Sequence, residues 1–109
     1  DLDSFDVEYF DNLELGIESA DIVMMLRIQK ERINDVNLPS IDEYFKHFGL
    51  THKKLTNAKK DVLVMHPGPI NRNIEIESSL ADDLDKSVIN EQVENGVAVR
   101  MACLAVMVK

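Results

Sequence analysis

The sequence contains 109 residues, of which 45% are hydrophobic and 29% are charged, and its formal net charge is -8. This size and apolar content suit one domain, or part of one, with a buried core, and they exclude a disordered tail. The acidic balance argues against nucleic acid and membrane partners, since phosphate backbones and anionic lipids repel negative charge. The longest apolar stretch, residues 101–108, is shorter than a membrane span, which needs about 20 residues, and acidic residues stand where a signal peptide would be basic. We therefore expect a cytoplasmic protein.

The first third of the chain predicts a strand, a helix and a second, buried strand. Apolar and acidic residues alternate in residues 5–9, which is a weak strand pattern. Residues 12–19 predict a short helix, because apolar side chains recur there at helical spacing. Residues 22–26 form a continuous apolar run that stops at Arg27. Such a run is typical of a strand covered on both faces, as in a parallel sheet.

The middle of the chain predicts two helices and another buried strand. Residues 41–48 follow the helix-starting pair Pro39-Ser40, and Gly49 occupies the usual glycine position after a helix. A second helix is expected over residues 51–58, with Leu55 facing inward. Residues 62–65 then repeat the pattern of a short apolar strand.

The last part of the chain predicts a polar loop and a long amphipathic helix over residues 87–108. Apolar residues recur there every three or four positions, and Asn95-Gly96 leaves open a later start of the helix. Strand, crossover helices and strand together form a βαβ unit. The sequence therefore predicts an α/β fold of three αβα layers with a mostly parallel, doubly wound (Rossmann-like) sheet.

Polar residues follow both buried strands. Arg27 and Gln29 follow the first strand, and the turn His66-Pro67-Gly68-Pro69 follows the second. Since parallel strands end at the same edge of a sheet, and this edge is where open α/β sheets bind ligands, we expect these residues to form one site.

The residue types suggest what this site binds. The guanidinium of Arg27 matches a carboxylate in bidentate fashion, and Gln29 adds a neutral amide, so together they suit a small dicarboxylate. The alternative is that Arg27 pairs with an acidic neighbour and Gln29 is solvated. The two prolines of the turn remove backbone donors, and the glycine allows a close approach, which leaves carbonyl oxygens that could accept from an amide or an amine. The alternative for the turn is a purely structural connection, and an X-Pro bond in it could be cis.

The remaining reactive residues predict no further chemistry. Cys103 lies in an apolar helical segment and is expected to be a buried, reduced thiol. The spacing of His47, His52 and His66 does not suit a metal site, so we expect no metal.

Three strings of the sequence resemble successive blocks of bacterial aspartate carbamoyltransferases. They are ADIVMMLRIQKERI (residues 20–33), VMHPGPINRNIEI (residues 64–76) and SVINEQVENGVAVRMACLAV (residues 87–106). The similar ornithine carbamoyltransferases carry a cysteine in the block of the His66 to Pro69 turn, and this chain has none there.

The resemblance implies that the complete protein transfers a carbamoyl group from carbamoyl phosphate to L-aspartate in pyrimidine synthesis, without cofactor or metal. By resemblance, Arg27 and Gln29 bind aspartate, and carbonyls of His66, Pro67, Gly68 and Pro69 contact the carbamoyl amine and the attacking nitrogen, with a cis Gly68-Pro69 bond. Arg32 matches an arginine that joins the two domains on closure. Asn71, Arg72 and Glu75 are expected to shape the loop beside the site, and Arg100 is given no catalytic role.

The resemblance also implies that residues 1–109 are the carboxyl-terminal part of the L-aspartate-binding domain, and an incomplete domain. The carbamoyl-phosphate domain, with its Ser-Thr-Arg-Thr string, is absent from these residues. We therefore expect no turnover from this chain alone, whereas complete members of the family form homotrimers; the sequence does not decide whether a regulatory subunit binds. Two alternatives are an inactive homologue or isolated domain that serves as a binding or assembly module, and a small nucleotide-binding domain, which the lack of a Gly-rich phosphate loop disfavours.

Overall fold

The structure is a computed structural model that describes residues 6–29 and 40–108. Its elements, in chain order, are α1 (Leu13–Gly16), β1 (Ile22–Met24), α3 (Ile41–Phe48), α4 (His52–Leu55), β2 (Leu63–Met65), α5 (Ser78–Ala81) and α6 (Ile89–Met107). The strands predicted at residues 22–26 and 62–65 and the helices predicted within residues 12–19, 41–48, 51–58 and 87–108 are therefore confirmed, with shorter limits.

The two strands pair in parallel, with Ile22 opposite Leu63 and Met24 opposite Met65. On the other side of β2, the N–H of Val64 donates to the carbonyl of Lys86 at 2.8 Å, and the N–H of Val88 donates to the carbonyl of Val64 at 3.0 Å. β2 thus lies between β1 and the segment that leads into α6. The α/β class and the parallel pairing are confirmed, and the sheet has two strands in the part of the chain that the structure describes.

The core surrounds β2. Its fully buried apolar side chains come from four separate segments of the chain; they are Leu50, Val62, Val64, Ile76 and Leu80. The loop between β2 and α6 joins this core, because the N–H of Leu50 donates to the carbonyl of Glu75 and the N–H of Glu77 donates to the carbonyl of Leu50. The loop that follows the His66 to Pro69 turn is therefore anchored to the core by backbone hydrogen bonds.

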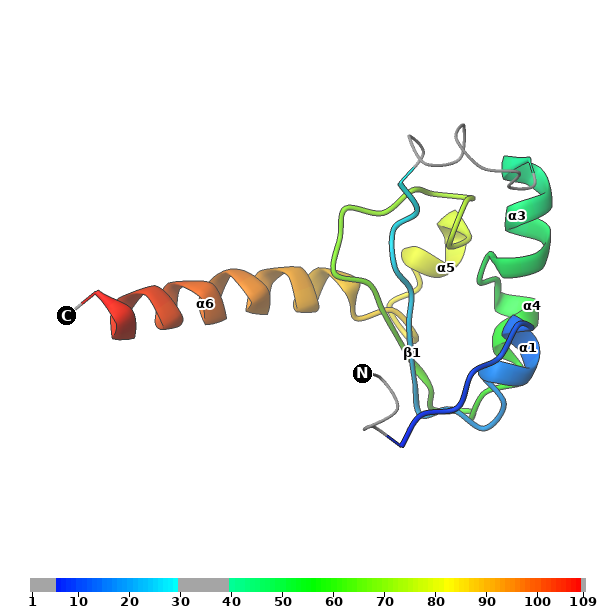
Figure 1. The fold of residues 1–109 in the computed structure, drawn as a ribbon, viewed down its shortest axis with the longest axis horizontal. Coiled ribbons are helices and arrows are strands. Elements are labelled where there is room, and N and C mark those ends of the chain that lie inside the picture. Colours follow the sequence, from blue (N-terminus) through cyan, green and yellow to red (C-terminus); the bar gives the residue numbers. More distant parts are fainter. Residues whose placement is uncertain (1–5, 30–39, 109) are drawn as a thin grey trace.

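The long helix α6 extends away from the rest of the molecule (Figure 1). Only Ile89, at its first turn, is buried, whereas Val97, Met101 and Leu104 are about half or more exposed. Cys103 is also exposed, so the prediction of a buried thiol is wrong. The apolar pattern correctly predicted a helix, but no described part of the chain packs against most of it.

Three other expectations need correction. Residues 6–10 form no strand. β1 is buried on one face only, because Ile22 and Met24 are 55% and 51% exposed. Gly49 does end α3, but its φ of -66° is not the left-handed conformation expected after a helix. A glycine is required there for another reason, since a Cβ atom would collide with the ring and the carbonyl of Phe45.

Candidate functional site

The two sequence segments predicted to form the site lie at the same edge of the sheet. β1 and β2 run in parallel and in register, and the N–H of Met25 donates to the carbonyl of Met65 at 2.9 Å just beyond them. The segment Arg27–Gln29 and the turn at His66 both continue from this edge. The predicted proximity of the two segments is confirmed.

A side chain from the loop ties these two segments together. Asn71 Nδ2 donates to the carbonyl oxygen of Ile28 at 3.0 Å, across 43 positions of the sequence. Ile28 stands between Arg27 and Gln29, and Asn71 follows two residues after the turn. This bond fixes the backbone of the Arg27–Gln29 segment relative to the turn.

Arg27 and Gln29 are both exposed. Within residues 6–29 and 40–108, no carboxylate forms an ion pair with Arg27, so the alternative of an acidic neighbour has no support there. Its guanidinium is accessible to a ligand from solvent. Arg32, which the resemblance assigned to domain closure, lies outside the described residues.

The turn after β2 has an unusual backbone. The Gly68-Pro69 bond is cis, as the resemblance implied, and Gly68 has a φ of +68°, a conformation that favours glycine over residues with a Cβ atom. Pro67 and Pro69 are exposed and Gly68 is half-buried. No residue that the structure describes donates a hydrogen bond to the carbonyl oxygens of residues 66–69. These oxygens are therefore acceptors that a ligand can use.

The side chain of His66 is fully buried behind the turn and does not face solvent. Its Nδ1 accepts from the N–H of Gly68 at 2.9 Å, and its Nε2 lies 3.1 Å from Oε1 of Glu75, which is also fully buried. Its backbone N–H donates to Oε1 of Gln92 at 2.8 Å. His66 thus supports the turn from inside, and its imidazole does not reach the accessible side.

The neighbouring loop residues are largely structural, as expected. Arg72 forms a bidentate ion pair with Asp82, at 2.6 and 2.8 Å, which closes the outer side of the loop. The sequence pointed to Glu75 as a loop residue, and its position between the apolar residues Ile74 and Ile76 was the signal for burial. The contact of Gln92 with the backbone of His66 was missed, because nothing in the local sequence distinguishes this glutamine from the other polar residues of the long helix.

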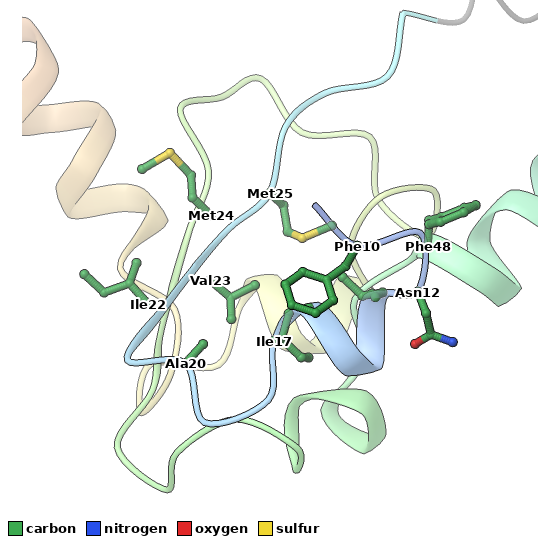
Figure 2. A pocket seen from close by; sticks show the side chains of 11 residues that line it. Phe10, Asn12, Ile17, Ala20, Ile22, Val23, Met24, Met25 and Phe48 are labelled. Carbon is green, nitrogen blue, oxygen red and sulfur yellow. The ribbon is translucent and has the colours of Figure 1, made fainter. Parts of the chain in front are cut away.

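An apolar groove lies elsewhere in the described part of the chain, along the edge of β1 that faces away from β2. It has a volume of about 360 Å³ and no charged side chain lines it. Figure 2 shows Val23 and Met25 pointing to the side of Phe10, whereas Ile22 and Met24 point the opposite way. A dicarboxylate needs cationic partners, so this apolar groove is not a substitute for the site at Arg27.

The described residues contain neither a metal-binding cluster nor a membrane-spanning helix. No three His, Cys, Asp or Glu side chains in this part of the chain gather as a metal site would require. None of its helices combines the length and the apolar character that crossing a bilayer demands.

Comparison with known proteins gives consistent results. A sequence profile described as "Aspartate/ornithine carbamoyltransferase, Asp/Orn binding domain" matches residues 3–107. The aspartate carbamoyltransferase catalytic subunit of Cereibacter sphaeroides is 53% identical over 105 residues, which cover 96% of this chain and 33% of the relative. The catalytic subunit from Parvibaculum lavamentivorans is 58% identical over 98 residues, or 90% of this chain and 30% of the relative.

A solved structure also matches. Aspartate transcarbamoylase from Trypanosoma cruzi, in complex with carbamoyl aspartate and phosphate, has a TM-score of 0.68 and 27% identity over 87% of this chain and 28% of that one. The chain spans about a third of the length of the relatives that it matches. Since this profile covers nearly all of the sequence, the chain belongs to the aspartate/ornithine carbamoyltransferase family, and residues 3–107 match the profile of its Asp/Orn binding domain.

Proposed function

We propose that this chain is the carboxyl-terminal, aspartate-binding part of an aspartate carbamoyltransferase. The complete enzyme transfers the carbamoyl group of carbamoyl phosphate to L-aspartate and so contributes to pyrimidine synthesis in the cytoplasm. The amine of aspartate attacks the carbamoyl carbon, the bond from that carbon to the phosphate oxygen breaks, and the amine loses one proton. The products are N-carbamoyl-L-aspartate and phosphate.

The observation that carries this proposal is the parallel register of β1 and β2 together with the bond from Asn71 to Ile28. This geometry brings an accessible guanidinium, at Arg27, to the same edge as the free carbonyl oxygens of the turn. A planar guanidinium binds a carboxylate with two parallel hydrogen bonds, and carbonyl oxygens act only as acceptors, so they suit a ligand that brings N–H donors. L-Aspartate and a carbamoyl group together offer both partners.

From this arrangement we infer a role for each residue of the site. Arg27 and Gln29 hold the carboxylates of aspartate. The carbonyls of the turn, from His66 through Pro67, Gly68 and Pro69, accept from the carbamoyl NH2 group and from the attacking amine. The contribution of these residues is to hold two substrates in register, which is a large part of the rate enhancement in a two-substrate reaction. Arg32 links this domain to the carbamoyl-phosphate domain when the enzyme closes.

The proposal assigns the remaining parts of the active site to segments outside these 109 residues. The chain alone is therefore expected to have no turnover, and the complete protein is expected to be a homotrimer. The competing hypothesis is an inactive relative that serves as a binding module. It predicts that the full-length protein consumes no carbamoyl phosphate in the presence of aspartate.

The decisive experiment replaces Arg27 with Ala in the full-length protein. A lost charge-assisted hydrogen-bonded pair is worth about 1.5–3 kcal/mol, so kcat/KM for aspartate should fall about 10- to 100-fold. The dissociation constant of carbamoyl phosphate should stay nearly unchanged. Lys60→Ala is the matched control, because it removes an exposed positive charge just before β2, at the opposite edge of the sheet. Equal kinetics of the Arg27→Ala variant and the wild type would remove Arg27 from the site.

A further inference from the structure

The carboxylate of Glu75 is connected to both halves of the proposed site. Both Glu75 and its neighbour His66 have no exposed surface, although neither residue type is commonly buried to this degree. Oε1 of Glu75 lies 3.1 Å from Nε2 of His66 and accepts from the N–H of Asn71 at 2.5 Å. Two hydrogen-bonded branches therefore start from one oxygen atom.

The first branch leads to the turn. The N–H of Gly68 can only donate, so Nδ1 of His66 must be the acceptor of their 2.9 Å bond. The ring proton then resides on Nε2, where it is donated to Glu75. This arrangement fixes both the tautomer and the plane of the imidazole, and it holds the backbone of Gly68 at a φ of +68°.

The second branch leads to the segment that carries Arg27 and Gln29. Glu75 holds the backbone of Asn71, and the side chain of Asn71 donates to the carbonyl of Ile28 at 3.0 Å. The carboxylate of Glu75 is thus two hydrogen bonds from Gly68 and two from Ile28. No other described side chain joins these two segments through hydrogen bonds.

Burial of the Glu75 carboxylate costs stability, because only one of its two oxygen atoms is hydrogen-bonded within the described part of the chain. Oε2 of Glu75 is buried and has no hydrogen-bond partner among the described residues, and an unpaired buried oxygen is costly. Replacing a buried polar pair with apolar side chains is often neutral or stabilising. Core packing therefore does not explain why His66 and Glu75 are buried together. A need to hold the two substrate-binding segments at a fixed separation does explain it.

We propose that Glu75 is a positioning residue which, through His66 and Asn71, sets the distance between the turn carbonyls and the aspartate-binding residues Arg27 and Gln29. The inference rests on the function proposed above. Its physical basis is that an error of about 1 Å in the alignment of two reactants costs about 100-fold in rate. Glu75 touches neither substrate and acts only through the backbone that it holds.

The test compares three variants of the full-length protein, with kinetic constants normalised to the folded fraction. Glu75→Leu removes both branches and should lower kcat/KM for aspartate about 100-fold. Glu75→Gln keeps an amide oxygen that can accept from both His66 and Asn71, so it should recover at least about 10-fold of that loss. Asn71→Ala keeps its backbone N–H and cuts only the bond to Ile28, so it should raise the KM for aspartate more than it lowers kcat. Asn73→Gly is the control in the same loop, since glycine keeps the positive φ and the variant loses only the bond from the N–H of Ser78, which joins neither segment; its kinetic constants per folded molecule should match the wild type.

The outcomes separate this inference from the proposed function. A purely structural role predicts variants with lower stability but unchanged kcat and KM per folded molecule, and that result in an active enzyme overturns the inference alone. If Glu75→Leu does not fold, Asn71→Ala decides, because a normal KM for aspartate in that variant also contradicts the inference. A full-length protein without carbamoyl transfer overturns the proposed function and this inference together.

Discussion

His52 lies between two carboxylates, one on each side of its ring. Nε2 is 2.9 Å from Asp83 and Nδ1 is 3.3 Å from Glu77, and the three side chains are partly exposed. The hydrogen bond with Asp83, followed by the effects of Glu77, raises the pKa of His52 above its usual 6.5. The backbone N–H of His52 is the main cause that lowers the pKa of Glu77, and the His52 side chain that of Asp83.

This cluster should make stability depend on pH in a defined direction. The contribution of His52 to the free energy of unfolding is fully present below its unfolded pKa, near 6.5. It is lost as the pH rises through the higher pKa of the folded state. The contributions of Glu77 and Asp83 are lost only at the acidic end, as the pH falls through their lowered values. Raising the pH from 6 to 8 should therefore lower the Tm of the wild type by about 2 °C, since exposed pairs contribute little.

The His52→Gln variant should lose the part of this Tm change that the cluster causes. Asp83→Asn removes the main partner of His52. The double variant His52→Gln, Asp83→Asn should therefore lower the Tm at pH 6 by less than the sum of the decreases in the two single variants. Thermal unfolding at pH 6 and pH 8 in low salt measures this. An unchanged difference in Tm between the two pH values in His52→Gln would contradict the assignment of the pKa shift to this cluster.

At the residue level, the sequence predicted the accessible members of the site better than their supports. Arg27, Gln29 and the turn follow apolar runs directly, and the parallel sheet brings strand ends together without further information. The hydrogen-bond partners Glu75 and Gln92 are 9 and 26 positions from His66. Such contacts depend on the path of the loop and of α6, which local patterns do not contain.

Helix α3 has a well-defined hydrogen-bond partner at each end. At its start, Ser40 and Glu43 form a reciprocal capping box. At its end, Nζ of Lys54 donates to the carbonyl oxygens of Lys46, His47 and Gly49 at 2.8, 3.1 and 2.9 Å. The partial burial that this position requires lowers the pKa of Lys54. A positive charge at this end also complements the dipole of the helix.

Lys54→Met should therefore destabilise the protein by about 1–2 kcal/mol, because the apolar chain is kept and three hydrogen bonds to one charged group are lost. The neighbouring variant Lys53→Met is the matched control, since the side chain of Lys53 is exposed and forms no ion pair within the described residues. Urea unfolding of both variants provides the comparison. If the two variants lose the same free energy of unfolding, Lys54 does not cap α3.

For the helices and strands, the strength of the local sequence pattern determined which elements could be predicted. The apolar runs at residues 22–26 and 62–65 and the capped segment 41–48 correspond to β1, β2 and α3. The four-residue helix α5 was missed, because its Glu77 N-cap makes no side-chain hydrogen bond and only Leu80 and Ala81 in it are apolar. The strand expected at residues 5–9 rested on alternation alone, and residues 6–10 have no neighbouring strand to pair with among the described residues.

At the level of the whole molecule, exposed apolar side chains gather in two regions of the part of the chain that the structure describes. One is the outer edge of β1, where Ile22 and Met24 are about half exposed beside the 360 Å³ groove. The other is α6, which projects from the body (Figure 1). Large exposed apolar surfaces are rare on monomeric soluble proteins. The prediction that α6 is amphipathic is wrong, because exposed apolar residues at spacings of two, such as Val97, Val99 and Met101, lie on different sides of the helix. Burial could not be predicted at these positions, because a local apolar pattern does not show which surface covers it.

This exposure predicts how the 109-residue chain behaves in isolation. Val97, Met101 and Leu104 are 49%, 65% and 61% exposed on α6, so the chain should self-associate at high concentration. In dilute, monomeric samples Cys103 should react with a thiol reagent as fast as a free thiol does. The double variant Val97→Lys and Leu104→Lys should make the chain more soluble and more monomeric, as measured by light scattering. Its free energy of unfolding should change by less than about 0.5 kcal/mol, since these residues contribute little to the core. A Cys103 that does not react with the thiol reagent, together with a large loss of stability in the double variant, would mean that α6 packs against the body of the isolated chain.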